Sequence, residues 1–224
     1  MPPSPPDRWE GLEVLARGAN RLCARDPVNP AHCLKFELPG AERTRAGLRA
    51  RIRRWFGRRF PSRGDNGTEL RAWQRLQHRH GDALAGRFAA THAVVETRWG
   101  PALRCDCVLL DDGTPAPSLY RCIFGELSSG ASRQSQLCEA VDDFERFLLA
   151  HRIPLFDLNA GNFVVVPAGD GIRLVCVDAK STVSGKELVP VSRWIPWLRR
   201  RKVRRRAERL KLRIRTALAN SSPL

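Results

Sequence analysis

The chain has 224 residues, of which 42% are apolar, and a formal net charge of +16. A chain of this length and composition buries a core, which excludes disorder of the whole molecule, and it holds one ordinary domain or two small lobes. It contains no apolar run of the roughly 18–20 residues that span a bilayer, and its start lacks the basic and apolar regions of a secretion signal. We therefore expect a cytoplasmic protein.

The predicted elements follow one another in an order that excludes a Rossmann or P-loop sheet. In chain order they are a hairpin at 12–24, a strand at 32–38, a helix within 41–63, a helix that begins near Thr68, strands at 91–97 and 102–110, a helix at 137–148, a hairpin at 163–177 and a basic helix from Trp194. The strands do not alternate with helices, and no G-x-x-x-x-G-K-[ST] motif occurs.

The positive charge is concentrated in two segments. Residues 41–63 carry nine Arg and one Glu, and residues 193–215 carry twelve Arg or Lys and one Glu. Such a segment is a solvated helix face, a surface for anionic membranes or a nucleic-acid patch. Bulky aromatic residues such as Trp55 and Trp197 lie among the arginines, which favours the membrane surface over nucleic acid.

The cysteines and histidines give no motif of their own. The seven cysteines include no C-x-x-C pair, and most lie among Leu and Val, as buried thiols of a reducing compartment do. The five histidines form no ligand pattern. We therefore expect free thiols and no metal site built from these residues.

A lysine and a glutamate stand out in the first half of the chain. Alternation turns Lys35 to the strand face opposite Leu34 and Phe36, and Glu69 shares the apolar face of its helix with Trp73. We expect Lys35 and Glu69 to form an ion pair. The alternative is a solvated edge lysine and a carboxylate favoured by the start of the helix.

The second half carries a D-x-x-x-x-N loop, from Asp157 to Asn162, directly before an apolar strand. Asp178 ends the second strand of that hairpin, and Lys180 follows it. Phosphoryl transfer from ATP uses a Lys on the phosphates, a Glu that positions it, an Asn and an Asp on Mg²⁺, and an Asp that orients the attacking hydroxyl. The alternative makes Asp157 and Asn162 turn formers and Asp178 a strand cap.

With these motifs in this order, the chain resembles the protein-kinase-like superfamily, and within it the YrbL family (the PhoP regulatory network protein). The likeness runs from about Arg17 to the basic tail. It includes G-A-N-R at 18–21, H-C-L-K at 32–35, E-L-R-A-W at 69–73 and D-L-N-A-G-N at 157–162.

This resemblance implies a fold and a set of site residues. The fold is α+β and bilobal, with an N-lobe at 1–110 that includes the basic insertion 41–63, a reduced C-lobe at 111–190 and a basic amphipathic helical tail at 191–224. Its catalytic residues are Lys35, Glu69 and Asp157, and its Mg²⁺ ligands are Asn162 and Asp178. ATP would contact Gly18, Cys33, Lys35, Leu110 and Lys180, with Cys33 over the adenine and Leu110 in the hinge.

Three departures from the family pattern limit the expected activity. The glycine-rich loop keeps only Gly18, Leu155-Phe156-Asp157 replaces H-R-D, and no A-P-E follows Asp178. We therefore expect an ATP- and Mg²⁺-dependent phosphotransferase that acts on a hydroxyl, of a sugar or glycolipid near the inner membrane surface, without a platform for protein substrates. The alternatives are a catalytically silent nucleotide-binding regulator and, less favoured, a nucleic-acid-binding protein.

Overall fold

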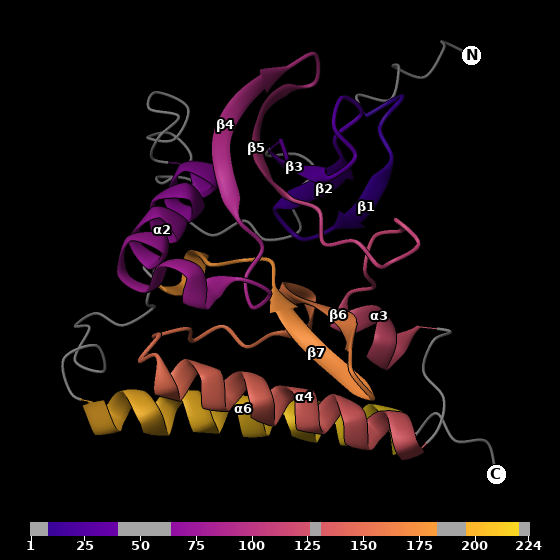
Figure 1. The fold of residues 1–224 in the computed structure, drawn as a ribbon. Coiled ribbons are helices and arrows are strands. Elements are labelled where there is room, and N and C mark those ends of the chain that lie inside the picture. The colour runs from indigo at the N-terminus through magenta and orange to yellow at the C-terminus, as the bar shows by residue number, and fades with distance from the viewer. Residues whose placement is uncertain (1–8, 40–63, 126–130, 183–195, 220–224) are drawn as a thin grey trace. The chain divides into compact units, whose positions relative to one another are not determined.

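The computed structural model describes residues 9–39, 64–125, 131–182 and 196–219 (Figure 1). The fold is α+β, as the element order predicts. The chain divides into two compact units: the first combines Met1–Gln74 with Ala90–Cys107, and the second combines Arg75–Ala89 with Val108–Leu224. The helix predicted within 41–63 lies outside the described residues.

The first unit contains a five-stranded antiparallel sheet with the spatial order β1-β2-β3-β5-β4 (Figure 1). Its strands are β1 (Val14–Arg17), β2 (Arg21–Arg25), β3 (His32–Glu37), β4 (Thr91–Thr97) and β5 (Gly100–Asp106). The predicted strand at 102–110 is too long, because the chain after Cys107 pairs elsewhere. Val108 accepts a hydrogen bond from Ala116, and Leu110 donates one to Thr114, both within the second unit.

Alternation along β3 separates the two faces of this sheet. Leu34 and Phe36 lie in an apolar cluster on one face, together with Trp9, Leu22, Ala24, Leu38 and Ala102. Cys33 and Lys35 point to the other face, and their register partners on β5 are Cys105 and Leu103. The chemistry expected of Lys35 therefore belongs to the face without the large apolar cluster.

The helix after β3, α2 (Asp65–His80), begins three residues before the predicted start at Thr68. Thr68 therefore lies inside the helix and is not its N-cap, and its hydroxyl donates to the Gly64 carbonyl. The helix start is held from β3 instead: Glu37 Oε1 accepts from the Asn66 N–H at 2.9 Å, and Asn66 Nδ2 donates to the Lys35 carbonyl at 2.8 Å. A carboxylate at this end also suits the helix dipole.

The second unit combines a two-stranded hairpin with helices (Figure 1). Its elements are α3 (Leu119–Phe124), α4 (Ala131–Ala150), the strands β6 (Phe163–Ala168) and β7 (Gly171–Cys176), and α6 (Pro196–Ala219). Its core includes buried aromatic rings: Phe144 contacts Phe88, Phe147 and Phe163 at centroid distances of 5.1–6.0 Å.

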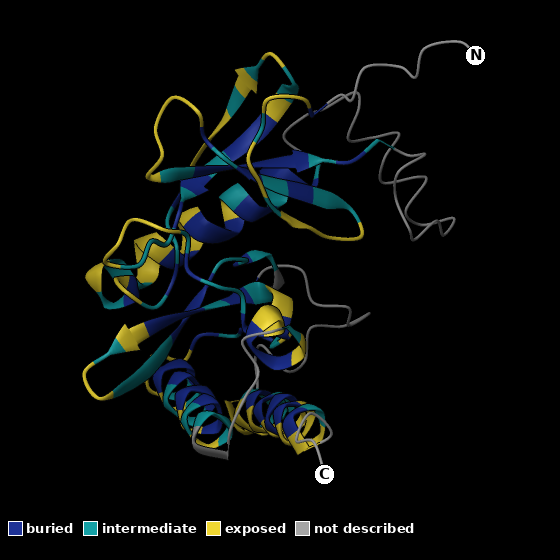
Figure 2. Cartoon of the chain, turned by 90° about the vertical axis from the view of Figure 1, so that its right-hand side faces the viewer, coloured by how far each residue is buried: buried dark blue, intermediate teal, exposed yellow. Residues whose placement is uncertain are grey.

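The basic helix predicted from Trp194 corresponds to α6, and its apolar side is covered. Val203, Ala207, Leu210, Ile214 and Leu218 are buried along it, and α6 packs against α4. Each of these two helices has a buried and an exposed side (Figure 2). Trp197 is 59% exposed, while Trp194 lies outside the described residues. Among the helices that the structure describes, none is long and apolar enough to cross a membrane.

Candidate functional site

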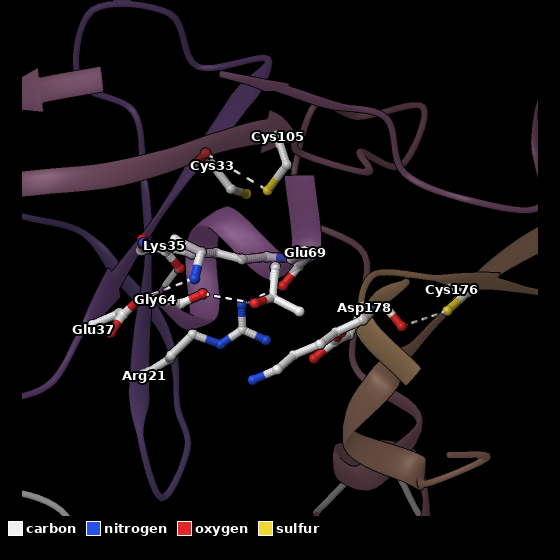
Figure 3. Close-up of polar contacts among 12 residues, drawn as sticks. Arg21, Cys33, Lys35, Glu37, Gly64, Glu69, Cys105, Cys176 and Asp178 are labelled. Carbon is white, nitrogen blue, oxygen red and sulfur yellow. Dashed lines mark hydrogen bonds and ion pairs between the residues drawn. The ribbon is translucent and has the colours of Figure 1, made fainter. Parts of the chain in front are cut away.

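The predicted ion pair between Lys35 and Glu69 is present, and it is buried (Figure 3). The Lys35 Nζ atom lies 2.6 Å from Glu69 Oε1, and the two residues are 8% and 1% exposed. Glu69 reaches this position because α2 is tied to β3 at its first turn and turns Glu69, Trp73 and Leu76 inward. Burying a charge costs free energy unless an opposite charge pairs with it, so each of the two residues makes burial of the other possible.

Arg21 on β2 is a second cation on the same carboxylate, at Glu69 Oε2. Burial alone would raise the pKa of Glu69, but the charges and hydrogen bonds of Lys35 and Arg21 outweigh burial and lower the pKa to about 2. The three groups together carry one net positive charge. Arg21 was missed as a site residue, because its position depends on the register between β2 and β3. In that register Cys23 lies opposite Lys35, and Arg21 shares the strand face of Cys23.

Cys33, expected over an adenine, lies among other thiols on the Lys35 face. All seven cysteines are free, as predicted. Cys105 Sγ donates to the Cys33 carbonyl at 3.7 Å (Figure 3). A hydrogen bond from Cys33, together with the charges of Lys35 and Arg21, outweighs burial and lowers the pKa of Cys23 to about 7.

The D-x-x-x-x-N loop lies in the second unit, directly before β6. Asn162 ends a short 3₁₀ helix (Ala160–Asn162), and its Nδ2 donates to the Asp157 carbonyl at 3.0 Å, which joins the two ends of the motif. Asp157 itself is exposed. Because Asn162 uses its amide nitrogen on Asp157, the side-chain oxygen is the atom it would offer to a cation.

Asp178 lies at the same end of the hairpin as Asn162. Phe163 pairs with Cys176, and the next backbone hydrogen bond runs from Val177 N–H to the Asn162 carbonyl at 2.9 Å. Asp178 Oδ1 accepts from the Lys180 N–H, and Cys176 Sγ donates to the Asp178 carbonyl (Figure 3). Amide and carboxylate oxygens are the ligands that Mg²⁺ prefers, so this end of the hairpin fits that ion.

Gly18 and Leu110 receive less support as nucleotide contacts. Gly18 lies in the exposed turn between β1 and β2, and an added Cβ would meet only an ordinary contact at 3.6 Å, so this turn does not require glycine. Leu110 uses its N–H on Thr114 and its carbonyl on Gly113. Its side chain packs on the apolar cluster around Val166. A nucleotide would compete with the Thr114 contact for the Leu110 N–H.

The predicted residues thus fall into two groups, one in each unit. One group is a buried strand lysine paired with a helix carboxylate. The other is an Asp/Asn loop before a hairpin that ends in Asp. Enzymes that transfer phosphoryl groups from nucleotides use both groups. No family model matches the chain, and no curated protein does so either. The YrbL likeness therefore rests on the sequence motifs themselves.

Among solved structures, the chain is similar to crystal structures of the PknI kinase domain of Mycobacterium tuberculosis. A double mutant of that domain gives a TM-score of 0.43 at 12% identity over 81% of this chain and 65% of that chain. A single mutant gives 0.41 at 12% identity, over 78% of this chain and 59% of that chain. The chain thus spans less than two thirds of the length of these kinase domains.

Proposed function

We propose that the chain binds ATP with Mg²⁺ and transfers a phosphoryl group to a hydroxyl. The observation that carries this proposal is the buried Lys35–Glu69 pair with Arg21 on the same carboxylate. Glu69 fixes the Lys35 ammonium, and the net positive charge of the three groups favours an anion such as a nucleotide phosphate. Stability alone does not account for this pair, since apolar side chains of the same volume often stabilise a core equally well.

The second unit would supply the metal ligands and the group that meets the acceptor. Asn162 and Asp178 offer oxygen ligands at one end of the β6–β7 hairpin, which supports a role in holding Mg²⁺. When bound, Mg²⁺ neutralises charge on the transferring phosphate. Asp157, with an exposed side chain, would orient the attacking hydroxyl. Lys180 would add a second phosphate contact, and Cys33 would lie against the adenine.

The acceptor we propose is a sugar or glycolipid hydroxyl close to an anionic membrane surface. The support is chemical: residues 41–63 and 193–215 carry a dense positive charge. The exposed side of α6 presents arginines to that surface, while its apolar side is buried against α4. On the motifs that it shares with them, we propose that the chain is a YrbL-type member of the kinase-like superfamily.

The experiment that tests this function is calorimetric titration of the full chain with ATP and MgCl₂, followed by a phosphate-transfer assay. Lys35→Met should weaken ATP binding by about tenfold or more, since it removes a charge-assisted phosphate contact. Asp178→Asn should weaken only the Mg²⁺-dependent part of binding. Asp157→Asn should bind ATP as the wild type does and lose phosphoryl transfer by about a hundredfold or more.

Asp170→Asn is the matched control, because Asp170 is an exposed carboxylate in the turn at the other end of the same hairpin. It should leave both binding and transfer unchanged. Wild-type protein that binds ATP without any turnover identifies a catalytically silent regulator. Protein that does not bind ATP with Mg²⁺ overturns the proposal.

A further inference from the structure

Two histidines and an aspartate from three strands meet in the first unit. His32 is the first residue of β3, His92 is the second residue of β4, and Asp106 is the last residue of β5. One ligand atom from each lies within 4.8 Å of the others. The spacing of the histidines in the sequence shows no ligand pattern, because these ligand atoms come together only in the folded sheet.

The strand register explains how these side chains converge. His32 lies opposite Asp106 in the β3–β5 pair, so both point to one face of the sheet. On β4, Thr91 pairs with Cys105 and Ala93 with Arg104, which leaves His92 as the extra residue of a β-bulge. Bulges redirect side chains and recur next to functional sites.

The contacts hold these groups in an orientation suited to a ligand. Asp106 Oδ2 accepts from the Ala90 N–H at 3.2 Å, while Oδ1 faces His92 Nε2 at 2.6 Å. The His32 and His92 rings meet edge to face with centroids 4.9 Å apart. The Nδ1 atom of His32 is buried and makes no hydrogen bond to any described residue. The backbone contact to Asp106 resembles the outer-shell bonds that orient ligands at metal sites.

The surrounding charges do not oppose a cation. Arg104 lies on the same strand face two residues before Asp106, and its guanidinium pairs with Asp26, with Nε 3.1 Å from Oδ2. Alternation places Lys35 on the opposite face of the sheet from His32. The cluster is thus separate from the Lys35–Glu69 pair.

We propose that His32, His92 and Asp106 bind a divalent transition-metal ion of the zinc class. Two imidazole nitrogens and one carboxylate oxygen suit Zn²⁺ and related ions and leave at least one position for water. Bonds of about 2.0–2.2 Å put tetrahedral ligand atoms roughly 3.3–3.6 Å apart, so a small rotation of the exposed His92 side chain completes the set. The ion would join β3, β4 and β5.

The test is equilibrium dialysis of the chelator-treated full chain against Zn²⁺, with the bound metal measured by mass spectrometry. His92→Ala and Asp106→Asn should each weaken Zn²⁺ binding by about tenfold or more, since each removes one ligand. His78→Ala is the matched control, because His78 is an exposed histidine on α2. It should retain wild-type affinity.

Co²⁺ provides a second readout that separates this site from the cysteines. Substitution with Co²⁺ should give visible absorption without the near-ultraviolet charge-transfer band of a thiolate ligand. Such a band, or wild-type affinity in either His92→Ala or Asp106→Asn, overturns the proposal, as does wild-type protein that retains no Zn²⁺. If circular dichroism shows that Asp106→Asn is unfolded, the exposed His92→Ala variant decides alone.

Discussion

Glu69 makes the stability of the fold depend on acid pH. Its pKa is about 2 in the folded protein, against an ordinary value of 4.5. The unfolded chain therefore takes up a proton first, and the stabilisation by ionised Glu69 is complete above pH 4.5 and lost as the pH falls toward 2. The difference corresponds to about 3 kcal/mol. Chemical denaturation between pH 6 and pH 2 should show this loss in the wild type.

Glu69→Gln isolates this contribution, because it removes the titrating group while the charges of Lys35 and Arg21 persist throughout the range. Its free energy of unfolding should fall less steeply than that of the wild type below pH 4.5. Glu96→Gln, at an exposed position on β4, should follow the wild-type curve. Parallel curves for wild type and Glu69→Gln would contradict the buried pair.

At the scale of residues, pairs within reach of simple alternation could be predicted and sets from several strands could not. Lys35 and Glu69 could be predicted because alternation fixes the strand face of Lys35 and apolar spacing fixes the helix face of Glu69. Arg21 and the set of His32, His92 and Asp106 depend on strand register, and at His92 also on a bulge. A one-residue shift in register turns every side chain to the other face, so such convergence needs the sheet itself.

At the scale of elements, the positions of most helices and strands follow from apolar spacing, but their ends follow from tertiary contacts. The start of α2 depends on Glu37 and Asn66, which join it to β3. The segment that contains α6 was predicted to contact a membrane through its arginines and aromatic rings, and apolar spacing on a helix is the same for a bilayer and for a protein core. Only the structure shows that α4 covers it.

The packing of α6 predicts a clear difference between two leucines two residues apart. Leu210 is 2% exposed and Leu212 is 62% exposed. Leu210→Ala should lower the free energy of unfolding by about 2–5 kcal/mol, because it opens a cavity against the core. Leu212→Ala, the same chemical change on the same helix, should stay within about 0.5 kcal/mol. Urea denaturation measures both, and equal losses would contradict a packed α6.

At the scale of the whole molecule, the basic side of α6 is the surface that we propose for binding anions. Trp197, Glu208 and four arginines, at 200, 201, 204 and 205, line a hollow on this helix. Because the apolar side is buried, binding to anionic membranes should be mainly electrostatic, with Trp197 as the exposed aromatic contact. Sedimentation with phosphatidylserine vesicles should show binding that falls steeply between about 0.05 and 0.5 M salt.

Two double variants with the same change in charge separate the effect of this surface on vesicle binding from the effect of the net charge of the chain. Arg201→Glu with Arg205→Glu should abolish most vesicle binding. Arg75→Glu with Arg79→Glu, an exposed pair at the same spacing on α2, should reduce it only slightly. Equal effects would show that the total charge decides, and preferential binding to duplex DNA over vesicles at equal phosphate would assign the surface to nucleic acid.

The order in which the chain enters its two units has a consequence for how the molecule can be dissected. The chain changes unit after Gln74, Ala89 and Cys107. Phe88 therefore belongs to the second unit, where it contacts Phe144 and Phe147. The strands of the five-stranded sheet, which precede and follow it in the chain, belong to the first unit. A cut after Cys107 would leave residues 75–89, which belong to the second unit, on the fragment that carries the first unit. The other fragment would lack Phe88 in its aromatic core. Recombination between relatives at that point would keep the sheet of the first unit whole but would break the aromatic core of the second unit.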